Sequence, residues 1–203
     1  MIDVARLTDV FRREFGGDPK LYRAPGRVNL IGEHTDYNGG FVLPAALELS
    51  TVAAIAPRRD RTLRLRSILM GETVSFDLDE REAKRRKDWS DYVRGVATIF
   101  EGAGYRLTGA DLMIDSDVPV GAGLSSSAAI EVATGYTLLS NSGLNIDLTR
   151  LALACQRAEN EFVGMRCGIM DQFIACHGAA GHALLIDCRS LDRRLVPIDP
   201  SVR

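Results

Sequence analysis

Apolar residues recur at helical spacing near the start of the chain, at Val4, Leu7, Val10 and Phe11. Arg12 and Arg13 follow, and then Gly16. Basic side chains favour the last turn of a helix because its carbonyl end carries partial negative charge, and glycine commonly ends the helix. The pattern predicts a first helix that ends just before Gly16.

From residue 21 to residue 78 the spacing becomes that of an extended chain. The clearest stretch is Leu63 to Arg66, where apolar and charged residues alternate. A period of two residues places the apolar side chains on one face of a strand. We expect strands at residues 51–56, 63–68 and 74–78.

Helical spacing returns in the second half of the chain. Asp88 or Ser90 can cap one helix start, and Asp147 or Thr149 another. We expect a helix at 89–102, a strand at 110–115, a buried helix at 128–139, a helix from 148 to 162, a short helix within 168–176 and a strand at 183–187. No repeat or linker interrupts this order, which predicts one α+β domain over residues 1–203, with a mixed sheet packed against helices.

Composition narrows the class of protein. Of the 203 residues, 46% are apolar and 26% charged, and the formal net charge is −2. This balance is typical of a globular protein and gives no reason to expect a nucleic-acid or membrane partner. The one basic run, residues 81–87, is interleaved with acidic residues, so we expect a solvated loop. No apolar run is long enough to cross a bilayer, and the start of the chain shows no signal peptide.

The cysteines form no CxxC pair; they are Cys155, Cys167, Cys176 and Cys188. We expect reduced thiols and a cytoplasmic location. Cys176, His177 and His182 lack a fourth ligand for tetrahedral zinc, so the sequence does not favour a zinc site.

A glycine- and serine-rich turn joins the strand expected at 110–115 to the next helix. It reads Gly121-Ala122-Gly123-Leu124-Ser125-Ser126-Ser127. Glycines let backbone amides approach an anion, the helix start adds partial positive charge, and hydroxyls donate to phosphate or bind a hard cation. The turn is neither a Walker loop nor a dinucleotide fingerprint. By itself it is compatible with phosphate binding and with a purely structural helix start.

A second group of polar residues lies between two glycine-rich points early in the chain. Its members are Arg27, Asn29, Glu33, His34, Asp36 and Asn38. Neighbouring carboxylates and amides suit recognition of several adjacent hydroxyl groups, because each oxygen can accept from a separate OH. Asn38-Gly39 also predicts a hairpin turn, which leaves Glu33 and Asp36 unexplained.

Two further carboxylates stand out. At 100° per residue, Glu159 falls within the apolar stripe of its helix and Glu161 on the opposite side. The stripe consists of Leu148, Leu151, Ala152, Cys155 and Phe162. A carboxylate there needs either a buried cationic side chain or a metal such as Mg²⁺. Asp171, after Gly168, would be either an N-terminal cap or first-turn acid of a short helix, or a catalytic group.

Together these stretches resemble the GHMP small-molecule kinases, and within them the galactokinases. Residues 26–37 (GRVNLIGEHTDY) match the galactokinase signature, and residues 121–129 (GAGLSSSAA) match the ATP loop of the superfamily. Residues 168–172 (GIMDQ) match the galactokinase form of the catalytic-aspartate segment. Residues 89–96 (WSDYVRGV) resemble a segment whose aromatic side chains lie beside adenine. The motifs occur in family order across essentially the whole chain.

The resemblance implies a fold and a set of site residues. The fold is the GHMP kinase N-terminal domain, similar to domain 2 of ribosomal protein S5. A galactose-binding region would cover about residues 18–50, and an ATP and catalytic region about residues 89–180. Catalytic roles would fall to Asp171 and Arg27, sugar contacts to Arg27, Glu33, His34, Asp36, Gly168 and Asp171, ATP contacts to Trp89, Tyr92 and Gly121 through Ser127, and Mg²⁺ to Ser127 and Glu159.

The implied reaction is transfer of the ATP γ-phosphoryl group to O1 of D-galactose. Two alternatives stay open: a kinase for N-acetylgalactosamine or a related sugar, and a non-catalytic sensor that binds galactose and ATP. The intact Ser126, Ser127 and Asp171 favour an enzyme. Galactokinases carry a second domain that completes the active-site cleft, and this chain ends at Arg203 before it. We therefore expect the C-terminal domain to be missing and the chain alone to be poorly active.

Overall fold

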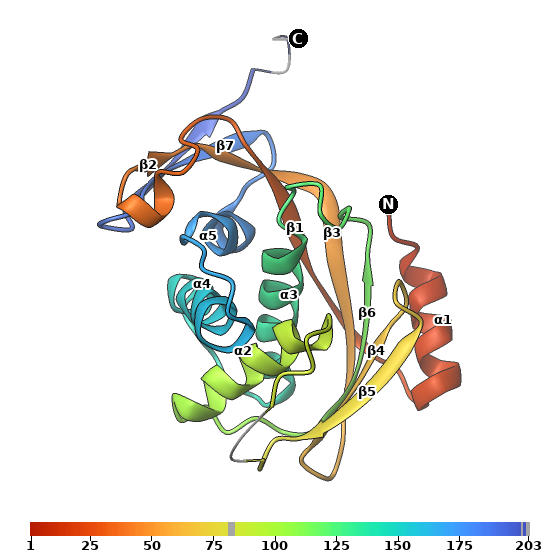
Figure 1. Cartoon of the computed structure of the whole chain (residues 1–203). Coiled ribbons are helices and arrows are strands. Elements are labelled where there is room, and N and C mark those ends of the chain that lie inside the picture. Colours follow the sequence, from red (N-terminus) through yellow and green to blue (C-terminus); the bar gives the residue numbers. More distant parts are fainter. Residues whose placement is uncertain (81–83, 200, 202–203) are drawn as a thin grey trace.

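The computed structural model describes residues 1–80, 84–199 and 201. Within them, eight strands form one mixed sheet (Figure 1). The strands are β1 Lys20–Asn29, β2 Phe41–Val42, β3 Pro44–Pro57, β4 Thr62–Ser67, β5 Glu72–Asp77, β6 Ala110–Ser116, β7 His182–Asp187 and β8 Arg193–Pro197. Their order is β2-β7-β3-β6-β4-β5, and β1 pairs with β3 while β8 pairs with β7. The pairing is antiparallel except between β4 and β6.

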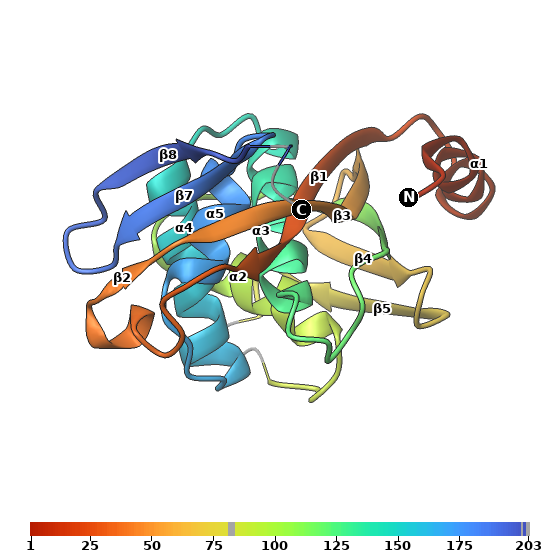
Figure 2. The same ribbon diagram turned by 90° about the horizontal axis from the view of Figure 1, so that it is seen from above.

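Helices cover both faces of this sheet, but unequally. Helix α1 packs on one face and the remaining helices gather on the other (Figure 1). They are α1 Val4–Phe15, α2 Ser90–Gly102, α3 Ser126–Asn141, α4 Leu148–Arg157, the π-helix η2 Ala158–Val163 and α5 Met170–His177. Seen from above, β7 and β8 lie at the opposite end of the molecule from α1 (Figure 2). The expected α+β architecture is confirmed.

Helix α1 shows how local signals and packing agree. The Asp3 carboxylate accepts a hydrogen bond from the Arg6 amide at 3.0 Å, and the chain leaves the helix through Gly16 at φ +79°. Leu7 and Phe11 are buried against the outer face of the sheet. The predicted first helix is therefore confirmed, with its end at Phe15.

The main core lies between the sheet and helices α2 to α5. The alternation in β4 places Leu63 and Leu65 in it, both completely buried, together with Phe100 of α2 and Leu112 of β6. Burial of each such side chain contributes about 1.5–3 kcal/mol relative to exposure. None of the described helices has the length and apolarity that a membrane crossing needs.

Several expected boundaries were wrong. The strand predicted at 51–56 is the second half of β3, which extends over Pro44–Pro57 because β1, β6 and β7 all pair along it. Strand β8 was not predicted. The helix predicted to continue to Phe162 is α-helical only as far as Arg157 and then becomes the π-helix η2.

The hairpin turn predicted at Asn38-Gly39 was also wrong. The segment is a short 3-10 helix, η1 Asp36–Asn38, and Gly39 follows it at φ +66°. Hydrogen bonding centred on Thr35 explains the wider loop, because its hydroxyl lies 2.7 Å from the Gly32 carbonyl oxygen and 2.8 Å from that of Phe41 and can donate to either. Of the predicted basic loop, residues 84–87 are exposed and residues 81–83 lie outside the described residues.

Candidate functional site

The site begins where strand β1 touches the phosphate loop, residues 117–125, between β6 and α3. A Cβ at Gly26 would lie 2.8 Å from the carbonyl oxygen of Leu124, so only glycine permits this approach. The Arg27 amide donates to the same carbonyl at 3.1 Å. This contact places the Arg27 side chain beside the loop.

Arg27 forms a two-point ion pair with Asp171, 144 residues further along the chain. Its Nε and one terminal nitrogen donate to the two carboxylate oxygens at 2.8 and 2.9 Å, and the other terminal nitrogen donates to the Gly123 carbonyl. The Ser125 hydroxyl also donates to Asp171. Side chains of Arg27 and Asp171 are 14% and 22% exposed, so the pair remains open to solvent on one side. The structure thus joins the two residues predicted as catalytic.

The phosphate loop itself presents an open backbone. Gly121 and Gly123 have φ of +76° and +70°, and Ser125 has φ of +58° although it is not glycine. Residues from Gly121 to Gly123 are exposed, and α3 starts directly after Ser125. Exposed amides ahead of a helix start of this length favour binding of an anion.

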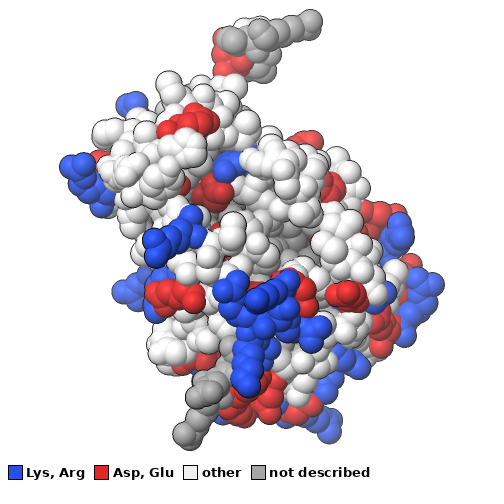
Figure 3. Space-filling model, viewed as in Figure 1, with Lys and Arg blue, Asp and Glu red and all other residues white. Residues whose placement is uncertain are grey.

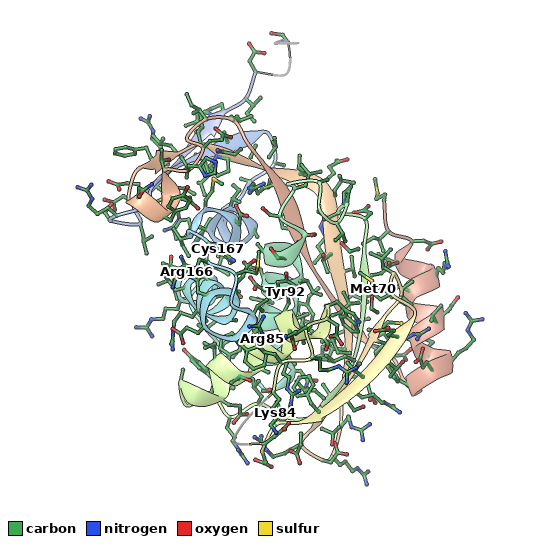
Figure 4. The ribbon with its side chains drawn as sticks, viewed as in Figure 1. Met70, Lys84, Arg85, Tyr92, Arg166 and Cys167 are labelled. Carbon is green, nitrogen blue, oxygen red and sulfur yellow. The ribbon has the colours of Figure 1, made fainter. Side chains whose placement is uncertain are left out.

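An open cavity lies beside this loop. It is lined by Trp89 and Tyr92 of the α2 segment, Met70 from the turn after β4, and Ser126 and Ser127 at the start of α3. Figure 4 labels Tyr92 and Met70 beside it, and Figure 3 shows a hollow with mainly uncharged residues around it on this face. The two predicted aromatic residues therefore lie in one cavity with the predicted phosphate-binding serines.

Glu159 lies behind the cavity and is 7% exposed. Its carboxylate accepts from Gln172 Nε2 at 2.7 Å and from the Cys167 thiol at 3.4 Å. Burial raises the pKa of Glu159, and hydrogen bonds from Ser127 and Cys167 act in the opposite direction. No ion pair involves Glu159 among the described residues, so the sequence alternative of a buried salt bridge is wrong for this part of the chain.

Ser127 and Glu159 are the residues predicted to hold Mg²⁺. The two side chains lie near each other, since the Ser127 hydroxyl lowers the pKa of Glu159, and both offer oxygen. Mg²⁺ in kinases is commonly held by one or two protein oxygens together with substrate phosphates, so this donor pair fits the ion. The described residues contain no group of three or more His, Cys, Asp or Glu side chains that could hold a metal. All four cysteines are free thiols.

The sugar residues predicted from the sequence are spread over the loop between β1 and β2. Glu33 and His34 are exposed and face solvent, where Asn29 Nδ2 donates to Glu33 at 2.9 Å and His34 Nδ1 lies 2.6 Å from the Tyr37 hydroxyl. Asp36 lies over Gly168, where a Cβ would come 2.0 Å from Asp36 Oδ2. Asp36 and Gly168 are therefore brought together, next to Asp171.

Some predictions from the sequence alone were wrong, and some contacts of the site were not predicted. Leu148 is 38% exposed and does not belong to the buried stripe of α4. Asp171 is not the cap of α5, because Ile169 precedes α5 without a side-chain cap, but it is the acidic residue in the first turn of this helix, as the sequence also allowed, and its carboxylate faces Arg27. The bond from Ser125 to Asp171 and the buried contacts of Gln172 were not predicted, although both residues belong to quoted motifs.

Two known protein families match parts of this chain. Residues 91–179 match the family model described as GHMP kinases N terminal domain, and residues 9–57 match the galactokinase galactose-binding signature. The chain is 52% identical over its whole length to a galactokinase of Chloroflexus aurantiacus and to one of Roseiflexus sp.. It spans about half the length of these curated relatives, 52% in each case.

Solved structures agree with the sequence comparisons. The Lactococcus lactis galactokinase complexed with galactose superposes with a TM-score of 0.92 at 38% identity, covering 97% of this chain and 52% of that one. The Methanococcus jannaschii mevalonate kinase shares the fold, with a TM-score of 0.74 at 20% identity over 89% of this chain and 56% of that one. The fold and the phosphate loop are those of a GHMP kinase N-terminal domain. Within that class, the chain belongs to the galactokinase family.

Proposed function

We propose that these residues form the substrate-binding half of an enzyme that phosphorylates D-galactose at O1 with Mg-ATP. One observation carries the proposal: Asp171 is held by Arg27 and Ser125 at the point where the phosphate loop, α5 and the loop carrying Asp36 meet. The identity to galactokinases and the galactose in the L. lactis structure support the choice of sugar.

The chemistry assigned to Asp171 is that of a base or orienting group at the O1 hydroxyl. As O1 bonds to the γ-phosphorus, the bond to the bridging oxygen breaks, ADP leaves with that electron pair, and the O1 proton passes to Asp171. Arg27, between Asp171 and the Gly123 carbonyl, is suited to offset the charge on the transferring group. Phosphoryl transfer depends mostly on such positioning and charge stabilisation.

The remaining predicted residues would bind and orient the two substrates. Trp89 and Tyr92 would contact adenine in the cavity, and the amides from Gly121 to Ser127 would donate to the phosphates. Glu33, His34 and Asp36 would receive the sugar hydroxyls, with Gly168 leaving the space for Asp36. Ser127 and Glu159 would hold Mg²⁺, which when bound neutralises phosphate charge.

The proposal extends to the setting of the reaction. Active sites of this superfamily lie in a cleft between two domains, so we expect a further domain of the complete protein to cover the site and exclude water. The four free thiols are consistent with a cytoplasmic location.

The test is galactose-dependent ADP release by the complete protein, with Asp171→Asn as the variant. We expect turnover to fall about 10²- to 10⁴-fold, the usual contribution of a general base, while galactose binding stays measurable. N-acetylgalactosamine assayed in parallel decides between the two sugars. Near-normal turnover of Asp171→Asn would remove Asp171 from the reaction, and sugar binding without any ADP release by the unaltered protein would favour a sensor.

A further inference from the structure

A buried polar cluster surrounds the proposed Mg²⁺ ligand Glu159, and its other members have no role in the proposed reaction. It consists of Glu131 on α3, Glu159 on η2, Cys167 in the loop before α5 and Gln172 on α5. Glu131 and Gln172 are completely buried, and Glu159 is 7% exposed. Two carboxyl groups so close together in a core are costly and need a specific partner.

Gln172 is the group that connects them. Its Nε2 donates to Glu131 Oε2 at 3.0 Å and to Glu159 Oε2 at 2.7 Å, so both amide hydrogens are used on carboxyl oxygens. Among the described residues, the second carboxyl oxygen of Glu131, Oε1, and the amide oxygen of Gln172 have no hydrogen-bond partner. A buried network left partly unsatisfied in this way contributes little to stability, which points to a role other than holding the fold together.

Gln172 directly follows Asp171 in the first turn of α5. Two neighbouring residues of this turn therefore face different partners. Asp171 binds Arg27 and Ser125, and Gln172 binds Glu159. The Ser127 hydroxyl lies near the same Glu159 carboxylate, whose pKa it lowers. Rotation of Gln172 would release Glu159 without breaking any contact of Asp171.

We infer that Gln172 is a positioning residue that orients Glu159 toward Ser127, and that Glu131 is its buried anchor. The inference rests on the proposed function only in taking Glu159 and Ser127 as ligands of the Mg²⁺ that accompanies the nucleotide. Partners of this kind behind a metal ligand typically change metal affinity by about 10- to 100-fold when they are removed.

The test measures binding of the non-hydrolysable nucleotide AMPPNP by calorimetry, in the complete protein, at stepped magnesium concentrations. Gln172→Met keeps the side-chain length and removes both donors. We expect the magnesium concentration for half-maximal enhancement of AMPPNP binding to rise about tenfold or more. AMPPNP affinity in EDTA should stay the same.

Gln156→Met is the matched control. Gln156 is partly buried, whereas Gln172 is completely buried. Gln156 donates to the Cys167 carbonyl at 3.3 Å, but among the described residues it forms no hydrogen bond to a carboxylate. If Gln172 had only a structural role, Gln172→Met would lower the melting temperature of the protein. It would not change the magnesium midpoint, the magnesium concentration for half-maximal enhancement of AMPPNP binding. A midpoint within twofold of that of Gln156→Met would overturn the inference.

A second pair of variants decides the matter if Gln172→Met does not fold. Glu131→Gln retains an oxygen that can accept from Gln172, and we expect its magnesium midpoint to match the unaltered protein. Glu131→Met removes that oxygen and should raise the midpoint; equal midpoints for the pair would contradict the anchor role. Because AMPPNP binding needs no sugar, a shifted midpoint without galactose phosphorylation would refute the proposed function alone, whereas an unshifted midpoint in an active kinase would refute this inference alone.

Discussion

Asp36 and Gly168 come from segments more than 130 residues apart in the chain, yet their atoms are in direct contact. A Cβ on Gly168 would lie 2.0 Å from Asp36 Oδ2 and 2.2 Å from its Cγ. An added methyl group would force the Asp36 side chain into another rotamer. The position of one proposed sugar contact therefore depends on the absence of a side chain at residue 168.

Gly168→Ala tests this dependence. We expect KM for galactose to rise at least about tenfold, the cost of losing one hydrogen bond to a charged group, with the affinity for nucleotide unchanged. Steady-state kinetics with each substrate varied in turn measures both. Gly102→Ala is the control, because a Cβ there meets no atom within 4 Å. Equal galactose KM values for the two variants would show that Asp36 does not need the space.

His177 predicts a pH dependence of stability. It is partly buried, its Nε2 lies 3.2 Å from the Thr149 hydroxyl, and its ring packs against the Phe173 ring at a tilt of 49° with centroids 4.5 Å apart. Burial lowers the pKa of His177 below the usual 6.5; the Arg193 charge lowers it further and Asp147 raises it. Below pH 6.5 the unfolded chain therefore binds more protons at this site than the folded chain, and stability falls with falling pH.

The urea midpoint of the complete protein should accordingly decrease between pH 7.5 and 5.5, and less steeply in His177→Gln. Parallel slopes for the two proteins would exclude His177 as a source of the pH dependence. Thr149→Val serves as a control for loss of the hydrogen bond alone, since it leaves the imidazole in place.

At the scale of elements, the junction of α4 and η2 determines which carboxylate faces the site. Glu159 is the second residue of the π-helix and points inward, whereas Glu161 is exposed and pairs with Arg157 at 3.0 Å. The amides of Gly164 and Met165 both donate to the Glu159 carbonyl, at 2.8 and 3.0 Å, which closes the wide turn. Single π turns within helices frequently occur at functional sites.

The two glutamates make a matched pair of substitutions. Glu159→Gln should raise the magnesium requirement of the complete protein by about tenfold or more, because a charged oxygen ligand becomes a neutral one. Glu161→Gln should leave the requirement unchanged, since its partner is an exposed arginine. A magnesium titration in which both variants behave alike would show that the inward carboxylate is not a metal ligand.

At the scale of the molecule, the site lies on an open face rather than in a closed cleft. Large apolar side chains are exposed on the same loops, among them Leu30, Ile31, Phe41 and Val120 with relative exposures of 52–66%. Exposed apolar groups of this kind mark surfaces that bind other protein surfaces. Water also reaches the proposed phosphate site, which weakens electrostatic stabilisation there.

We therefore expect the 203 residues expressed alone to form oligomers and to release ADP far more slowly than a galactokinase of full length. Size-exclusion chromatography and a galactose-dependent ADP assay measure the two properties. A monodisperse monomer with full-length rates would contradict this expectation. Substitution of Ile31 and Phe41 by serine should reduce the association without restoring turnover.

The sequence alone determined the class of the protein and most of its motifs, because these depend on residues close together in the chain. A few neighbouring positions were enough to predict the alternation in β4, the glycine and serine run before α3, and the inward-facing acidic residue of the segment that forms α4 and η2. The family resemblance then assigned roles to residues whose function spacing alone left open, such as Asp171.

Only the tertiary structure decided which of these residues meet. The Arg27–Asp171 pair joins residues 144 positions apart, and Ser125–Asp171 and Glu131–Gln172 join residues 46 and 41 apart. No local periodicity encodes such contacts, since they arise when β1, α3 and α5 pack together. The π-helix was hidden for the same reason: Phe162 fits against Gly95 of α2, where a Cβ would come within 3.1 Å of its ring, and this packing is a property of two helices rather than of one segment.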